Sequence, residues 1–482
     1  MAEMDPANFD AAEQLPPVNP LRIENPALIP AARYYDEAFY RLECERLWPN
    51  VWQMACRLEQ IPNVGDWIEY SNVGKSVIIV RTKDGIKAHQ NHCRHRGVPL
   101  AGGQGNAEGK SAHGNCAKSG FICPFHGWRW NMEGECTFVY GRHLFDEELL
   151  DKDELALRPV RVETWGGCAF INHNPDAPSL RESLGPVLDR LEARGMSKLR
   201  SEWWFATVLP ANWKVAMEAF MEGYHVMKTH PQLQHAQPSL YNSRYGNETG
   251  GLGPTVNPNA SARQNVCEAL DSMELLSAGM AGLVHGKEVE IARQFEHAEL
   301  PEDPQVAMMT WYGMVCEAIT KQLRERGEDV PDLVQVMQEH PVEAVEYLFP
   351  HYFLLTYFTS MSSYRIRPLG PESCLFEIWS LTHFPEGQEP EPVRESTVLP
   401  FDSQDFPMIP RQDYSNIPIQ QKGLHSEGLD VLRLSKEREG LISNYQRLID
   451  GYIAGAEGER LAAANRKLGG NFDGPILDLE LE

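Results

Sequence analysis

Cysteine, basic charge and long hydrophobic runs are all scarce in this chain, and each scarcity excludes a class of protein. Ten cysteines are spread over 482 residues, too few for a fold held together by disulfides, so we expect reduced thiols. Lysine and arginine total 44 against 68 aspartates and glutamates, a formal net charge of −24, which argues against a nucleic-acid binder. The most apolar run, 347–358, is too short to cross a membrane and is interrupted by Pro350 and His351.

Targeting and nucleotide-binding signals are missing as well. The first 20 residues have neither the basic nor the apolar region of a secretory signal. The best match to a phosphate-binding loop, 105–111, is one residue short between its glycines and follows no strand-like run. We therefore expect a cytoplasmic protein with no membrane or nucleic-acid partner and no ATP or nicotinamide site of its own.

The length predicts two or more domains. Residues 1–45 are expected to form an N-terminal arm and a first helix that pack on the catalytic domain. Residues 46–172 contain short β-branched and aromatic runs bounded by turn residues, which predict a small all-β domain; the runs are 65–70, 76–82, 86–92, 121–131 and 168–174. Residues 173–482 mix strand-like and helical patterns and predict an α+β domain.

Within this second domain we expect strands in 352–370 and 373–384, and helices in 180–196, 314–327 and 330–348. Apolar residues also recur at helical spacing near the C-terminus, which predicts a helix with one buried face; they are Leu441, Tyr445, Leu448, Ile449 and Tyr452.

Two short segments each combine a thiol and an imidazole: Cys93 with His95, and Cys123 with His126. A glycine follows each histidine closely and lets the backbone approach a sulfur or a metal. Three interpretations stay open on the residues alone. They are unrelated buried side chains, a structural zinc site, and a 2Fe–2S cluster with two cysteines on one iron and two histidines on the other. Zinc sites usually pair cysteine with cysteine, which disfavours the second interpretation.

The residue order of these two segments bears on the choice among the three interpretations. "CRHRG" followed by "CPFHGW" resembles the ligand motifs of a Rieske iron–sulfur domain, and 47–67 resembles the opening strands of that domain in ring-hydroxylating oxygenases. The resemblance implies that Cys93 and Cys123 hold one iron, that His95 and His126 hold the other, and that Trp128 covers the cluster. A Gly-rich insertion, 101–120, lies between the two segments, and its Cys116 remains an alternative ligand.

A second cluster, Glu222, His225 and His230, lies within 211–231. On a regular helix Glu222 and His225 would share a face, whereas His225 and His230 would point in different directions. Pro231 disfavours helical backbone at His230, so we expect the helix to end or deform there. Two histidines with one carboxylate form the open-sided triad of non-haem Fe(II) oxygenases. Ordinary surface or core histidines are the alternative.

The segment 212–230 resembles the catalytic iron motif of the same oxygenase family. The resemblance implies that His225 and His230 are iron ligands, and that Glu222 bridges to a Rieske histidine of a neighbouring subunit. Asp413 stands eight residues before the glutamine of "QKGL", as in the family's closing motif. This relation implies that Asp413, rather than Asp402 or Asp405, is the third ligand. Ala219 stands where the family often has asparagine.

Taken together, the chain resembles the large (alpha) subunit of the aromatic ring-hydroxylating dioxygenases, which are Rieske non-haem iron oxygenases. The implied fold is an all-β Rieske domain beside an α+β catalytic domain, built on an antiparallel sheet with helices (helix-grip type). The implied cofactors are a 2Fe–2S cluster and a mononuclear Fe(II). The implied partners are a reductase or ferredoxin, dioxygen, an aromatic or other hydrophobic substrate, the other subunits of a homotrimer, and a small beta subunit in some assemblies. A zinc-stabilised hydrolase and a pure electron carrier are the alternative functions.

Overall fold

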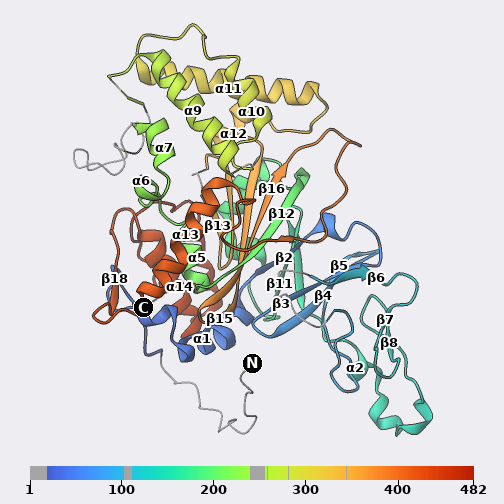
Figure 1. The fold of residues 1–482 in the computed structure, drawn as a ribbon. Helices are drawn as coiled ribbons and strands as arrows, with labels where there is room; N and C mark the ends of the chain where they lie inside the picture. Colours follow the sequence, from blue (N-terminus) through green and yellow to red (C-terminus); the bar gives the residue numbers. More distant parts are fainter. Residues whose placement is uncertain are drawn as a thin grey trace.

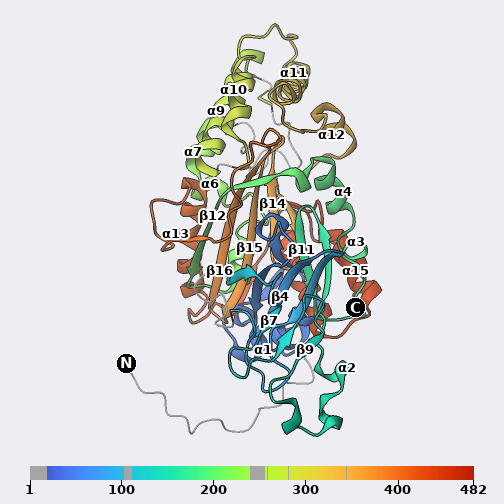
Figure 2. The same cartoon turned by 90° about the vertical axis from the view of Figure 1, so that its right-hand side faces the viewer.

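The computed structural model describes residues 19–102, 111–238, 241, 256–257, 259–280, 282–342 and 345–481. Small β-sheets form one part of the molecule, and a long, helix-covered sheet forms the other (Figure 1). Figure 2, turned by 90°, shows the small sheets in front of the long one, with the helices α9 to α12 gathered at the top. This combination of an all-β part and a larger α+β part confirms the predicted fold class.

Three small antiparallel sheets make up the part predicted to be all-β. Their strand orders are β10-β11-β2, β5-β4-β3-β6 and β7-β8-β9. The strands are β2 (Gln53–Arg57), β3 (Asp66–Asn72), β4 (Lys75–Thr82), β5 (Gly85–Gln90), β6 (His113–Asn115), β7 (Phe121–Ile122), β8 (Arg129–Trp130), β9 (Cys136–Phe138), β10 (Arg161–Trp165) and β11 (Cys168–Asn172). Every predicted run contains a strand, but 121–131 is divided into β7 and β8 by a turn that carries the second Cys/His segment.

The long sheet has the order β13-β14-β15-β16-β12-β17 and is antiparallel except for the parallel pair β12 and β17. Its strands are β12 (Arg200–Leu209), β13 (Val345–Leu348), β14 (Tyr352–Thr356), β15 (Met361–Gly370), β16 (Ser373–Thr382) and β17 (Thr397–Val398). The strands predicted in 352–370 and 373–384 are thus confirmed. Their side chains are buried along almost their whole length, because helices and the small sheets cover both faces.

Helices surround this sheet, except α2, which lies beside β7 and β8 among the small sheets (Figure 1). They are α1 (Glu37–Leu42), α2 (Lys152–Leu155), α3 (Leu180–Leu184), α4 (Pro186–Ala193), α5 (Trp213–Glu218), α6 (Val226–Thr229), α7 (Pro231–Ala236), α9 (Ala262–Met280), α10 (Gly286–Arg293), α11 (Pro304–Glu325), α12 (Leu333–Glu339), α13 (Met408–Gly423), α14 (Gly440–Ile453) and α15 (Gly458–Leu468). The predicted C-terminal helix is α14, and its apolar face is buried as expected.

One predicted helix is wrong in part. Among the described residues of 330–348, only α12 is helical, and Val345–Leu348 is strand β13 at the edge of the long sheet. Pro341 cannot continue the hydrogen-bond pattern of a helix, and all four residues of β13 are buried beside β14. Pairing with the sheet therefore overrides the helical pattern that the sequence shows there.

The N-terminal segment lies against the large part of the molecule. Strand β1 (Leu28–Pro30) pairs with β18 (Val431–Arg433), and the buried guanidinium of Arg33 forms an ion pair with Asp450 at 2.6 Å. A shared hydrophobic cluster, which includes Trp52, Trp204 and Trp379, joins the small sheets to the long one. Within the described ranges, no helix is both long and apolar enough to span a bilayer.

Candidate functional site

The two Cys/His segments fold as matching turns. In each turn the cysteine N–H donates to the carbonyl five residues on, at 2.7 Å from Cys93 and 2.8 Å from Cys123. Each cysteine carbonyl accepts from a glycine amide four residues on, at 2.9 Å from Gly97 and 3.0 Å from Gly127. These glycines have φ of +79° and +71°, and no protein atom lies within 4 Å of where a Cβ would stand. The left-handed backbone, rather than close approach of other protein atoms, therefore selects glycine here.

The matching turns place the thiols inside and the imidazoles outside. Cys93 and Cys123 are each 2% exposed, whereas His95 and His126 are half-buried with their ring centroids 4.8 Å apart. Burial raises the pKa of the Cys93 thiol to about 11, and its hydrogen bond with Cys123 adds to this rise. Nδ1 of His95 is buried with no hydrogen-bond partner among the described residues. Two paired thiols on one side and two imidazoles on the other fit a 2Fe–2S cluster held by two cysteines and two histidines.

Aromatic rings enclose this first site. Trp128, which is expected to cover the cluster, stacks on His95 with centroids 4.7 Å apart and planes 9° apart. Phe145 meets the same imidazole edge-on at 5.7 Å. Phe145 was not predicted from the sequence, because only the fold brings it next to the two turns. The thiol of Cys116 instead donates to the Gly65 carbonyl at 3.3 Å. Residues 103–110 of the insertion lie outside the described residues.

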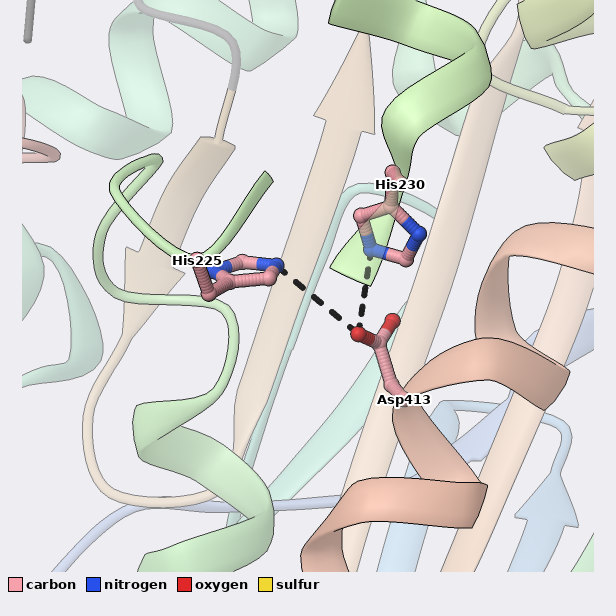
Figure 3. A group of neighbouring side chains, drawn as sticks. All are labelled: His225, His230 and Asp413. Atoms are coloured by element: carbon pink, nitrogen blue, oxygen red, sulfur yellow. Dashed lines mark ion pairs between the residues drawn. The ribbon is translucent and has the colours of Figure 1, made fainter. Parts of the chain in front are cut away.

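The second site brings His225, His230 and Asp413 together (Figure 3). Nε2 of His230 lies 3.1 Å from Oδ1 of Asp413, and Nε2 of His225 lies 3.7 Å from the same oxygen. One ligand atom from each residue lies within 4.8 Å of the other two. His230 and Asp413 are almost fully buried, while His225 keeps 24% of its side chain exposed. Oδ2 of Asp413 is buried with no hydrogen-bond partner among the described residues, so this group fits a metal bound by two histidines and one carboxylate.

Local backbone breaks make this grouping possible. Helix α5 ends at Glu218, and His225 caps the following short helix α6. His230 lies between α6 and α7 with φ of −121° and ψ of 60°, so the predicted break before Pro231 is present. Glu222 and His225 lie in a turn, and the expected shared helix face is wrong. Asp413 comes from the interior of α13.

Each imidazole has a hydrogen-bond acceptor at its outer nitrogen. Oε1 of Glu222 lies 2.9 Å from Nδ1 of His225, and its Oε2 accepts from the His225 N–H at 2.9 Å. Burial by itself would lower the pKa of His225. The hydrogen bond with Glu222 and the negative charges of Glu222 and Asp413 outweigh burial, so the pKa of His225 is raised. Oε1 of Gln412 lies 2.7 Å from Nδ1 of His230. Gln412 was not predicted from the sequence as a site residue, and the one sequence feature that points to it is its position next to Asp413.

Aromatic side chains lie beside the triad. Phe220 contacts Tyr364 and Phe376 at centroid distances of 5.3 and 5.8 Å, and Phe376 contacts Tyr414 at 5.0 Å. Tyr414 follows Asp413 directly. Burial, with the nearby Asp413 carboxylate, raises the pKa of Tyr364. This side of the triad is therefore uncharged and aromatic.

Comparison with protein families places both sites in known domains. Residues 189–455 match the family model for the ring hydroxylating alpha subunit (catalytic domain). Residues 51–141 match the Rieske 2Fe–2S domain. The first range contains the triad, and the second contains both Cys/His turns.

Individual relatives cover less of the chain. The oxygenase subunit of carnitine monooxygenase from Escherichia coli is 30% identical over 208 residues, which is 42% of this chain and 52% of that protein. The alpha subunit of biphenyl 2,3-dioxygenase from Rhodococcus jostii is 35% identical over 208 residues, 41% of this chain and 42% of that protein. The chain thus spans about half the length of the curated relatives it matches. A naphthalene 1,2-dioxygenase variant bound to phenanthrene shares the fold, with a TM-score of 0.61 at 20% identity over 91% of this chain and 95% of that one.

Proposed function

This chain belongs to the ring-hydroxylating alpha-subunit family, and we propose that it is the terminal oxygenase of an electron-transfer system. A separate ferredoxin or reductase supplies its electrons, since the sequence shows no flavin or nicotinamide site. When bound, the 2Fe–2S cluster carries single electrons and the mononuclear Fe(II) activates dioxygen for hydroxylation or oxidative demethylation of the substrate. The observation that carries the proposal is the meeting of His225, His230 and Asp413 in a chain that also folds two Cys/His turns.

The residues have distinct roles in this proposal. Cys93 and Cys123 bind one iron of the cluster, and His95 and His126 bind the other. His225, His230 and Asp413 bind the mononuclear iron. The support is the inward thiols, the outward imidazoles and the buried, unpartnered Oδ2 of Asp413.

Electron transfer between the two sites is proposed to cross a subunit boundary in a homotrimer. The strands β7 and β8 of the cluster turns and the helix α6 of the triad lie on opposite sides of the molecule (Figure 1). Glu222 uses both oxygens on His225, and a carboxylate has lone pairs left for a second histidine. Glu222 itself is 8% exposed, whereas Tyr224, two residues on, is 58% exposed, so the turn that carries Glu222 reaches the surface. Glu222 can therefore accept from a cluster histidine of a neighbouring subunit and orient both imidazoles.

The electron donor is proposed to dock beside the cluster turns. Phe125 is 60% exposed and lies 4.1 Å from the His126 ring, and the guanidinium of Arg96 stands over Phe125. Arg129 stands over the exposed Phe138 in the same way. Arg94 is already engaged by Glu154 at 3.9 Å. A basic and aromatic surface of this kind suits an acidic ferredoxin.

The substrate is proposed to be aromatic or otherwise hydrophobic. Tyr414 follows Asp413 and Tyr364 lies near its carboxylate, and both pack into a cluster of rings with Phe220 and Phe376. An apolar, aromatic surrounding favours a flat hydrocarbon over a zwitterion, which would leave its charges unpaired. The similarity to a carnitine monooxygenase makes a quaternary ammonium compound the second candidate.

Turnover with a surrogate ferredoxin and reductase tests the proposal. Anaerobically reconstituted protein is offered biphenyl in one reaction and carnitine in another, under isotopically labelled dioxygen, with products identified by mass. Labelled oxygen in a biphenyl product supports the proposal, and a labelled product from carnitine alone transfers the assignment to the second candidate. Protein that contains neither acid-labile sulfide nor iron contradicts the function itself and leaves the zinc-stabilised hydrolase. A cluster without a second iron leaves the pure electron carrier.

A further inference from the structure

Two glutamine side chains form a reciprocal pair behind His230. The Gln232 amide nitrogen donates to Oε1 of Gln412 at 2.8 Å, and the Gln412 amide nitrogen donates to Oε1 of Gln232 at 3.2 Å. The same Oε1 of Gln412 faces Nδ1 of His230 at 2.7 Å. Oε1 of Gln412 is therefore within hydrogen-bond distance of both the His230 imidazole and the Gln232 amide.

This arrangement decides which nitrogen of His230 holds the proton. The Gln412 oxygen can only accept, so Nδ1 must donate and Nε2 keeps its lone pair. Nε2 is the atom that faces Asp413 at 3.1 Å. Rotation of Gln412 alone would present its nitrogen to the imidazole but would break both bonds with Gln232, so the two amides can turn only together. A metal on Nε2 would leave the ring proton on Nδ1 and so favour the orientation of the pair that keeps the Gln412 oxygen toward His230.

The glutamine pair also joins the two segments that carry the triad. Gln412 precedes Asp413 on α13, and Gln232 follows His230 on α7. Asn416, further along α13, donates to the Thr229 hydroxyl at 3.4 Å. These contacts hold the His230 turn against α13 and orient the imidazole toward the carboxylate through protein groups alone. Preorganised ligands bind a metal more tightly, because less ordering remains to be done.

We infer that Gln412, supported by Gln232, is a positioning residue that holds His230 as a neutral Nε2 ligand for the mononuclear metal. The inference rests on the proposed function for the identity of that metal. The two histidines then differ in a defined way, since His225 has the carboxylate of Glu222 behind it and His230 has a neutral amide. A carboxylate acceptor makes an imidazole a more basic ligand than an amide does.

Ferrous ion affinity of the full chain, measured anaerobically by competition with a chelator, tests the inference. Gln412→Leu removes the acceptor at similar size and is expected to weaken Fe(II) binding about 10- to 100-fold. Gln412→Glu restores an acceptor oxygen and is expected to bind Fe(II) within about threefold of the wild type. Gln232→Leu frees the Gln412 amide to rotate and is expected to weaken binding less than Gln412→Leu does. Gln420→Leu, at an exposed position on the same helix, is the matched control and should leave affinity unchanged.

A second readout separates positioning from folding. The electron paramagnetic resonance spectrum of the ferrous nitrosyl complex should shift in Gln412→Leu and Gln412→Glu, because the donor strength of His230 changes, and should not shift in Gln420→Leu. Wild-type affinity in Gln412→Leu would overturn the inference while leaving the proposed function standing. An equal loss in Gln412→Leu and Gln412→Glu would also overturn it, since the acceptor would then be irrelevant. Absence of Fe(II) binding by the wild type would instead refute the proposed function.

Discussion

Nε2 of His230 lies 3.1 Å from Oδ1 of Asp413, although the whole of the helices α9 to α12 and most of the long sheet separate the two residues in the sequence. The carboxylate comes from the middle of a long helix, and the imidazole comes from a break between two short ones. A helix therefore positions one ligand, while the turn between α6 and α7 aims the other at it.

Loss of this carboxylate should remove the second iron alone. In Asp413→Ala, we expect no product and no tightly bound ferrous ion, because two imidazoles hold Fe(II) poorly without a charged oxygen ligand. The visible absorption of the cluster should persist. Product formation and metal analysis are the measurements, with Asp405→Ala, at an exposed position, as the control. Turnover by Asp413→Ala would show that the ligand set is wrong.

Glu222 offers a test of electron transfer between subunits. Glu222→Gln keeps the shape and one acceptor oxygen but removes the charge behind His225. We expect the mononuclear iron to remain and the single-turnover rate of cluster oxidation to fall by about tenfold or more. Rapid-mixing absorption of the prereduced protein measures this rate. A rate equal to that of the wild type would count against Glu222 as the bridge.

The cysteines distinguish the cluster turns from the insertion. Cys123→Ser should abolish the cluster absorption, since a hydroxyl is a poor ligand for iron and sulfide. Cys116→Ser is the matched control, because that buried thiol contacts the Gly65 carbonyl, and its cluster spectrum should be unchanged. The reverse pattern, with the cluster kept in Cys123→Ser and lost in Cys116→Ser, would make Cys116 the ligand.

Docking of an acidic donor should depend on ionic strength. Raising salt from about 0.05 to 0.5 M shortens the range of charge interactions from roughly 14 to 4 Å, so we expect the second-order rate of cluster reduction to fall. Arg96→Gln should lower the low-salt rate and weaken its salt dependence. Stopped-flow reduction by ferredoxin measures both effects. Flat salt profiles for the two proteins would exclude the surface around Phe125.

Glu218 should make stability depend on pH. Its buried carboxylate accepts from the Tyr34 hydroxyl at 2.8 Å, and burial raises its pKa to about 7 from 4.5. Because the pKa of Glu218 is raised in the folded state, its protonated carboxyl contributes stability that is fully present below pH 4.5. That contribution is lost as the pH rises through 7. This group should lower the free energy of unfolding by on the order of 3 kcal/mol between pH 4.5 and 8.

Glu218→Gln cannot ionise and should remove that contribution while keeping the polar contacts. The difference in free energy of unfolding, variant minus wild type, should therefore increase from pH 5 to pH 8. Denaturant titrations at several pH values measure it. Parallel curves for the two proteins would mean that Glu218 stays ionised, or stays protonated, throughout that range.

The sequence alone determined the local chemistry of both sites. Cys93, His95, Cys123 and His126 stand out in the sequence through their resemblance to Rieske motifs, which can be recognised because each turn is built from neighbouring residues with glycine at positive φ. The break at His230 could be predicted for the same reason, since Pro231 acts on the residue directly before it. Strands such as β4 and β11 could also be predicted, because the residue pattern of each lies within one short run of the sequence.

Tertiary structure decided whatever depends on residues that are distant in sequence. Pairing beside β14 made Val345–Leu348 a strand against its helical pattern, and the packing of α13 against the α6–α7 turn brought Gln412 to His230. The turn that Glu222 shares with His225 replaced the predicted helix, because α5 ends early at Glu218, which is held by Tyr34. Burial and long-range hydrogen bonds outweigh the fraction of a kilocalorie per residue in local preference, so such contacts follow from the complete fold and not from spacing.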